Sequence, residues 1–238
     1  MDEPPQVPRL VGSVIDDIGM GPYQVKETAL SGCVALAEGA ELLLISSVTR
    51  AVAEDWGLTT TQKGGVVSVV FMGVLIGTLI SGPCSDRVGR QRPIMIGIAA
   101  IAIFSILSAF TIGFWTLAIV RGVVGLAFGF GVPVCKAYCL EVAPTSWRSF
   151  SCVLLNLFYS AGEAYSVYII WLDDPSMKHL HWRWLLIVGA LPTIILTFLS
   201  AACLNESPTW LASRGREEEA REVVSKMMKM NGSGCAKL

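Results

Sequence analysis

Six apolar stretches, each near the length needed to cross a lipid bilayer, restrict the fold of this chain more than any other feature. A helix rises about 1.5 Å per residue, so about 20 residues cross the roughly 30 Å hydrocarbon layer. The linkers between the stretches are short, and within lipid only hydrogen-bonded helices satisfy such a backbone. We therefore predict an all-α membrane protein, a bundle of six antiparallel transmembrane helices at about 28–48, 64–82, 93–113, 114–137, 149–170 and 183–203.

The composition agrees with a membrane protein and argues against several other classes. Hydrophobic residues make up 53% of the 238 residues and charged residues 16%, against about a quarter charged in soluble domains. The net charge of −1 and the even spread of basic residues predict no nucleic-acid partner. We find no nucleophile elbow, phosphate-binding loop or metal-ligand cluster, and we therefore expect no enzyme activity, no cofactor and no metal.

The distribution of Lys and Arg predicts the orientation. If the N-terminus lies in the cytoplasm, 13 of the 18 Lys and Arg fall on the inner side, four on the outer side and Arg121 within a span. This bias follows the positive-inside rule. We predict cytoplasmic termini, with an N-terminal segment at 1–27, the bundle at 28–203 and a tail at 204–238. The expected location is the plasma membrane or an intracellular vesicle.

The tail contains a second helical pattern. In "GREEEAREVVSKMMKMN", residues 215–231, the apolar positions recur at helical spacing and charged residues occupy the other positions. This pattern predicts an amphipathic helix that lies on the inner membrane surface or on the bundle. Its apolar face consists of Ala220, Val223, Val224, Met227 and Met228.

Four charges are concentrated in the turn "GPCSDRVGRQRP", residues 82–93, between the second and third stretches. A positive-inside anchor explains the arginines but not the aspartate or the spacing of the glycines. The pattern resembles the G-x-x-x-D-R-x-G-R-(R/K) signature of the major facilitator superfamily, at the place where that family carries it. The matching residues are Gly82, Asp86, Arg87, Gly89, Arg90 and Arg92.

Later segments resemble the same superfamily in the same order. "RGVVGLAFG" at 121–129 is similar to its fourth-span motif, and "EVAPTSWR", from Glu141 to Arg148, to the following loop of sugar-porter-like members. "NESPTWLASRG" at 205–215 resembles "PESPRWL", with Asn205 in place of Pro. The start is most similar to synaptic-vesicle-related transporters and organic-ion or aromatic-acid symporters. The motif after the sixth span includes Glu206, Ser207, Pro208 and Arg214.

This resemblance covers the amino-terminal half of a twelve-span fold and implies one bundle of two inverted three-helix repeats. It also implies that the charged turn latches this bundle to a second six-helix bundle, from the rest of a longer protein, a partner chain or a second copy. Within the chain we expect Glu141 to contact Arg87 or Arg90, and Arg148 to contact Asp86. Gly82 and Gly89 would permit a tight turn and close helix approach.

Ionisable residues within the spans are candidates for the transport chemistry, because a charge at the centre of a transmembrane helix costs roughly 2.5–3.5 kcal/mol on insertion scales. These residues are Glu38, Glu41, Arg121 and Glu163. Three acids against one base predict a site that favours cations. We expect Arg121 to pair with one of the acids, while another acid, with a pKa raised by desolvation, carries a proton. A purely structural ion pair is the alternative.

Two functions are compatible with these patterns. The first is transport of a small organic solute by alternating access, coupled to protons as a symporter, with lipid, solute and protons as the partners. The second is a half-transporter without transport of its own, which dimerises, binds a partner or acts as a receptor. The substrate is not predictable from the sequence, because cavity residues come from both bundles in this superfamily.

Overall fold

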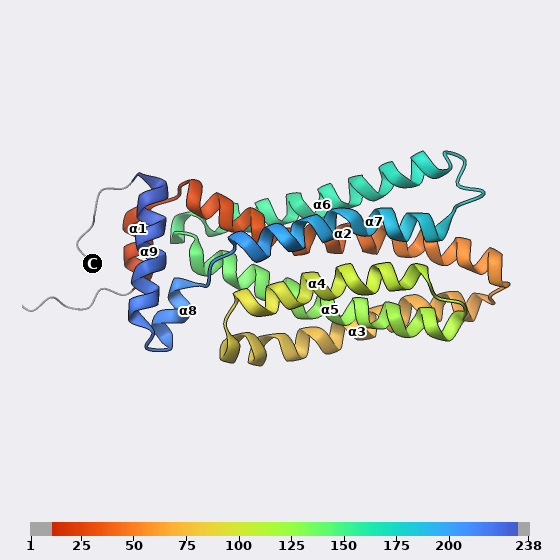
Figure 1. Ribbon diagram of the computed structural model, residues 1–238, viewed down its shortest axis with the longest axis horizontal. Coiled ribbons are helices and arrows are strands. Elements are labelled where there is room, and N and C mark those ends of the chain that lie inside the picture. The colour runs from red at the N-terminus through yellow and green to blue at the C-terminus, as the bar shows by residue number, and fades with distance from the viewer. Residues whose placement is uncertain (1–10, 233–238) are drawn as a thin grey trace, which may run out of the picture.

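The computed structural model describes residues 11–232, and six of its helices are long and apolar enough to cross a membrane, as predicted. They run side by side as one elongated bundle (Figure 1). Short connections join neighbours, so consecutive helices are antiparallel. The six are α2 (Pro22–Trp56), α3 (Thr60–Val88), α4 (Gln91–Ala109), α5 (Phe114–Val142), α6 (Arg148–Asp173) and α7 (Trp182–Cys203).

The first helix is longer at both ends than the predicted stretch 28–48. It begins at Pro22, whose fixed φ suits a first helical position, and it ends where Gly57 adopts the left-handed conformation at φ +63°. Its first turns carry polar side chains, including Gln24 and Glu27, which the structure buries completely. Hydropathy alone therefore placed the helix start too late.

Glycines bring α3 and α5 into close contact. A Cβ atom added at Gly73 or Gly77 would collide with the backbone of α5, and one added at Gly125 or Gly129 would collide with that of α3. The four-residue spacing of these glycines predicts such packing, because small residues let transmembrane helices approach. The two rows of glycines therefore form one close interface between α3 and α5. Gly39 of α2 and Gly162 of α6 form a second such crossing.

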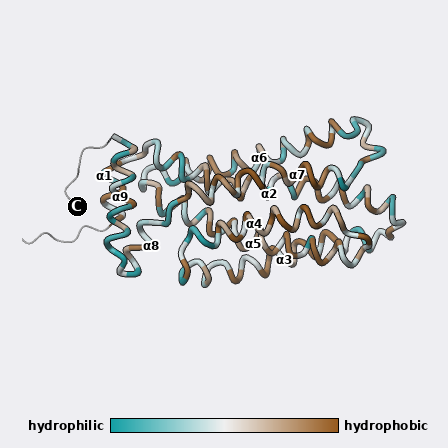
Figure 2. The backbone as a smooth tube through the Cα atoms, in the orientation of Figure 1, coloured by the Kyte–Doolittle hydropathy of each residue, from teal (hydrophilic) through white to brown (hydrophobic). Residues whose placement is uncertain are grey.

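Apolar side chains cover much of the outer surface of the bundle. Phe71, Leu79, Ile103 and Phe198 are each more than half exposed, as expected for side chains that face lipid rather than water. Figure 2 shows hydrophobic residues along the bundle and hydrophilic residues at its two ends and over α1 and α9. This distribution is that of a membrane-spanning protein.

Three further helices lie across one end of the bundle, which we call the α9 end (Figure 1). They are α1 (Val11–Ile18), α8 (Pro208–Ser213) and α9 (Glu217–Asn231). The five apolar residues of the predicted tail helix are all buried, and Val224 and Met228 pack against Val14 of α1. This helix was predicted to lie on the inner membrane surface or on the bundle, and in the structure it packs on the protein.

Helix α1, within the predicted segment 1–27, was not foreseen as a helix. Its Asp16 accepts hydrogen bonds from the backbone N–H of Thr145, at 2.6 Å, and from the Thr145 hydroxyl, at 3.0 Å. These bonds lower the pKa of Asp16. At the other end of the chain, Asn231 accepts a hydrogen bond from the Tyr23 N–H at 3.0 Å. Both terminal helices are therefore attached to the bundle by polar contacts.

Candidate functional site

A buried ion pair joins α2 to α5. Arg121 donates through Nη1 to Oε2 of Glu41 at 2.5 Å, and the two side chains are only 2% and 1% exposed. The second oxygen of Glu41 and the second terminal nitrogen of Arg121 are also buried, and neither has a hydrogen-bond partner in the described structure. The structure thus selects Glu41 from the three acids considered for Arg121, and leaves each partner with unused hydrogen-bonding capacity.

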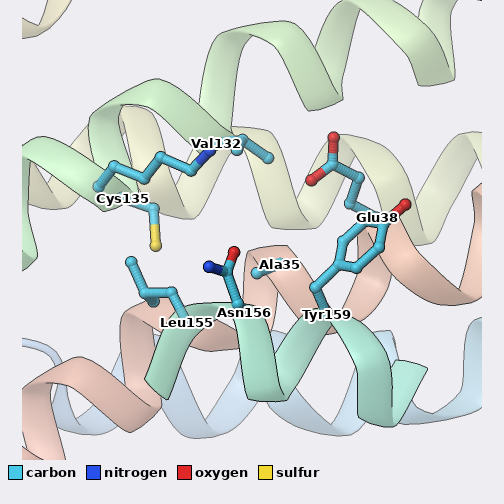
Figure 3. Close-up of a pocket in the computed structure, with 8 residues that line it drawn as sticks. Ala35, Glu38, Val132, Cys135, Leu155, Asn156 and Tyr159 are labelled. Atoms are coloured by element: carbon cyan, nitrogen blue, oxygen red, sulfur yellow. The ribbon is translucent and has the colours of Figure 1, made fainter. Parts of the chain in front are cut away.

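Glu38 lies about one turn from Glu41 and lines a different feature, a pocket of about 270 Å³ between α2, α5 and α6 (Figure 3). Lys136 of α5 and Asn156 and Tyr159 of α6 line the same pocket. Apolar walls complete it, formed by Ala35, Val132, Cys135 and Leu155. Neither Glu38 nor Lys136 has an ion-pair partner within 4 Å among residues 11–232.

Glu163 belongs to the same level of the bundle. Its backbone nitrogen faces Gly39 where α2 crosses α6, which places it beside the segment of α2 that carries Glu38 and Glu41. The side chain is half-buried, and within the described chain it has no ion pair within 4 Å. Asn156, Tyr159 and Glu163 follow each other at helical spacing on α6, so they share one face of that helix. We call Glu38, Lys136, Asn156, Tyr159 and Glu163 the polar face.

Arg90 is the centre of the charged turn at the α9 end. Its guanidinium donates to Glu141 at 3.0 Å through Nε, and to Asp86 at 2.8 Å through Nη1. Burial disfavours its charged form, but the hydrogen bonds and the attraction of Glu141 and Asp86 outweigh this effect and raise the pKa of Arg90. Glu141 was predicted to contact Arg87 or Arg90, and in the structure it contacts Arg90.

The segment after the sixth span holds this turn. Oε1 of Glu206 accepts hydrogen bonds from the backbone N–H groups of Arg90, at 2.8 Å, and Gln91, at 3.1 Å. These groups form the start of α4, where a carboxylate is favoured by unpaired N–H groups and by the helix dipole. Gly89 has φ +106° and directly contacts the Glu206 carboxylate, so a larger residue would displace it.

Helix α8 adds contacts to the same turn. Ser207 caps α8, with its hydroxyl accepting from the Trp210 N–H at 3.2 Å, and Pro208 occupies the first helical turn. The Trp210 indole N–H donates to the Asp86 carbonyl at 2.8 Å, and the Arg214 guanidinium donates to the same oxygen. The two motifs, more than a hundred residues apart in sequence, thus form one unit.

Several predicted latch residues lie elsewhere. The expected contact of Arg148 with Asp86 is not formed, because Asp86 pairs with Arg90, while exposed Arg148 lies near Asp16 of α1. A Cβ atom on Gly82 would meet nothing within 4 Å among the described residues, so close approach does not explain that glycine there. Arg87 and Arg92 are exposed.

A buried carboxylate near the start of α2 was not predicted from the sequence. Glu27 is completely buried and accepts hydrogen bonds from the Tyr138 hydroxyl, at 2.7 Å, and the Asn205 amide, at 2.6 Å. Lys26 pairs with it at 2.9 Å. Asn205 is the position at which the chain departs from "PESPRWL", and this departure was the available signal. No group of three or more His, Cys, Asp or Glu side chains in residues 11–232 is placed to hold a metal ion.

Comparison with known proteins places this geometry in a family. The sequence model described as "Sugar (and other) transporter" matches residues 22–234. The chain belongs to this transporter family. It is 35% identical over 214 residues to organic cation/carnitine transporter 7 of Arabidopsis thaliana, covering 90% of this chain and 42% of that protein. It is 29% identical over 224 residues to the synaptic vesicle 2-related protein of Xenopus laevis, covering 94% and 40%.

The fold of this chain also matches a solved structure. The major facilitator superfamily proton:xylose symporter XylE of E. coli superposes with a TM-score of 0.78 at 22% identity, over 87% of this chain and 50% of that one. The bundle is therefore a major facilitator fold. The chain spans about two fifths of the length of the two curated relatives.

Proposed function

We propose that this chain forms the six-helix part of a secondary transporter that moves a small organic solute by alternating access. Membership of a transporter family supports this proposal, and the polar face carries it. Lys136 and Asn156 are exposed on helices that cross the membrane, where a charge facing acyl chains costs several kcal/mol. Such a face is stable only against water or other protein. A water-filled cavity closed by a second six-helix bundle provides both.

Proton coupling is the second part of the proposal. Protonation of Glu41 would leave Arg121 as an uncompensated buried charge, at a cost of about 3–5 kcal/mol. Glu163, which has no such partner among residues 11–232, is therefore the better proton carrier, and Glu38 the better solute contact. The turn around Arg90 acts as the latch to the second bundle, with both termini in the cytoplasm, as the Lys and Arg distribution predicts.

Uptake into liposomes tests both parts. We expect the protein to accumulate a solute from a panel of organic cations, zwitterions, acids and sugars when the outside is more acidic than the inside. Glu163→Gln should abolish this accumulation but retain exchange of labelled for unlabelled solute, since exchange needs no net proton movement. Glu218→Gln, on the exposed face of α9, is the matched control.

Two results would contradict the proposal. Accumulation by Glu163→Gln that follows the proton gradient as in the wild type would exclude Glu163 as the carrier. Absence of both uptake and exchange for every solute would exclude transport by this chain and favour the partner-binding or receptor-like alternative.

A further inference from the structure

The charge balance of the pocket differs from the one that the sequence predicts. Three acids and one base in the spans favour a cation site, but the structure removes Glu41 and Arg121 from this balance as a closed pair. What faces the pocket is Glu38 on one helix and Lys136 on another. The pocket therefore carries one negative and one positive group, and its formal charge is zero.

These two groups attract each other across the pocket but form no direct ion pair. No ion pair within 4 Å involves either of them in the described part of the chain, although both line the same 270 Å³ space. Lysines near helix ends often extend to the membrane surface instead, but this one contributes to the pocket wall. An acid and a base held apart in one small cavity leave two opposite charges available to a ligand.

This arrangement selects among ligand classes. A cation would be attracted by Glu38 and repelled by Lys136, whereas an anion would be attracted by Lys136 and repelled by Glu38. A neutral polyol would leave both charges without a counter-charge as the site closes and loses water, which is costly. A solute that carries both charges pairs with both groups, so neither charge of the pocket is left without a counter-charge.

We propose that this pocket binds a small zwitterionic solute, with its cationic group at Glu38 and its carboxylate at Lys136. This inference names the substrate class of the proposed transport function and therefore rests on it. The volume lies just below the roughly 300–1,000 Å³ of pockets for drug-sized ligands, which suits a small metabolite.

The positions of the lining residues give the ligand an orientation. Glu38 and Tyr159 lie next to each other on one side of the pocket, and Cys135 and Leu155 on the other, with the Asn156 amide between them (Figure 3). The Tyr159 ring can stabilise an ammonium group beside Glu38 by a cation–π contact. Lys136 lines the same pocket from α5, a different helix from the one that carries Glu38. The amide of Asn156 is placed to donate to a carboxylate.

Binding of matched probes to the purified 238-residue chain in detergent tests the proposal without requiring transport. Glycine betaine carries both charges, choline only the cation, and 3,3-dimethylbutyrate only the carboxylate on a betaine-shaped skeleton. A longer trimethylammonio carboxylate tests the charge separation, and xylose serves as the neutral polyol. We expect one of the two zwitterions to bind about tenfold or more tightly than choline, 3,3-dimethylbutyrate or xylose, measured by calorimetry or by ligand-dependent unfolding temperature.

Two variants should change the selectivity in opposite directions. Glu38→Gln removes the partner of the cation, so it should weaken zwitterion binding about tenfold and leave 3,3-dimethylbutyrate as the better single-charge probe. Lys136→Met should weaken zwitterion binding similarly and make choline the better one. If Glu38 and Lys136 had only a structural role, their replacement would weaken the binding of all probes to the same extent. Glu218→Gln and Lys229→Met, both exposed on α9, are the charge-matched controls and should bind like the wild type.

The outcomes separate this inference from the transport proposal. Each of four results would overturn the zwitterion site. These are choline binding as tightly as the zwitterions or more tightly, preference for xylose, an equal loss of binding for all probes in both variants, and no binding of any probe at any soluble concentration. Uptake of another solute together with any of these results would leave the transport function intact. If the zwitterion binds and the two variants shift the selectivity in the predicted opposite directions, but neither uptake nor exchange occurs, the site is upheld and transport is refuted.

Discussion

Removal of either partner of the Arg121–Glu41 pair should destabilise the bundle far more than removal of both. The two side chains are 2% and 1% exposed and 2.5 Å apart. Loss of one partner leaves an uncompensated buried charge, which costs about 3–5 kcal/mol, whereas replacement of the pair by apolar groups of similar volume is often neutral or stabilising. We therefore expect Glu41→Gln and Arg121→Met each to lose about 3–5 kcal/mol, and Glu41→Leu with Arg121→Met to lose much less.

Thermal unfolding of the purified protein in detergent, followed by circular dichroism, measures this difference. For a chain of this size each kcal/mol shifts the unfolding temperature by about 2–4 °C, so each single variant should unfold about 6–20 °C below the wild type. Arg50→Met together with Glu54→Gln removes an exposed pair at 3.4 Å and should shift the temperature little. Additive effects in the double variant, or single variants as stable as the wild type, would refute the reasoning.

Three further predictions concern helix packing and the α9 end. Gly125→Val should destabilise the bundle by about 1–3 kcal/mol of overpacking, because its Cβ would collide with the Val70 carbonyl, whereas Gly82→Val, with open space around it, should not; unfolding temperatures compare the two. Glu206→Ala should cost about 1–3 kcal/mol by leaving N–H groups at the start of α4 unpaired, and hydrogen exchange at Arg90 and Gln91 should accelerate while exchange in α7 stays unchanged. Asp16→Asn should weaken the contact of α1 with Thr145 at neutral pH. The folded pKa of Asp16 is lowered, so its carboxylate stabilises the folded state fully above the ordinary aspartate pKa of about 3.9. This stabilisation is lost as the pH falls through the folded pKa, and the unfolding temperatures of wild type and variant should therefore converge in acid. A difference in unfolding temperature that does not change with pH would contradict this.

Hydropathy and small-residue spacing were sufficient to predict the six helices and that the glycine rows of α3 and α5 pack closely against other helices, because both depend on local composition and on periodicity along one helix. That these two rows meet each other was visible only in the structure. The start of α2 was not predictable in this way. Its first turns bury Gln24 and Glu27, whose partners, such as Asn205 and Asn231, come from the other end of the chain. From sequence alone, a polar residue is predicted to be solvent-exposed unless its hydrogen-bond partner is known.

The candidate site shows the same division between local and non-local information. The sequence places Glu38, Glu41, Arg121 and Glu163 within the spans, and it narrows the partner of Arg121 to three acids. It does not distinguish Glu38 from Glu41, since residues three apart share a helix face and a small rotation of α2 decides which one meets α5. Lys136 counted only toward the orientation of the chain, because its place in the pocket depends on how α5 packs against α6.

Helix α2 connects the separate polar features of the bundle. It carries Glu27 at the α9 end, Glu38 in the pocket and Glu41 in the closed pair, and each contacts or faces a different part of α5 or the segment after α7. Glu27 and Glu38 are separated by eleven residues, about 16 Å along a rigid helix. The segment at 204–207 bonds both Glu27 and the start of α4, so it joins α2 to α4 at the α9 end. Because a buried ion pair adds little net stability compared with apolar groups of similar volume, we expect the Glu41–Arg121 pair to act mainly by fixing α2 in one register against α5.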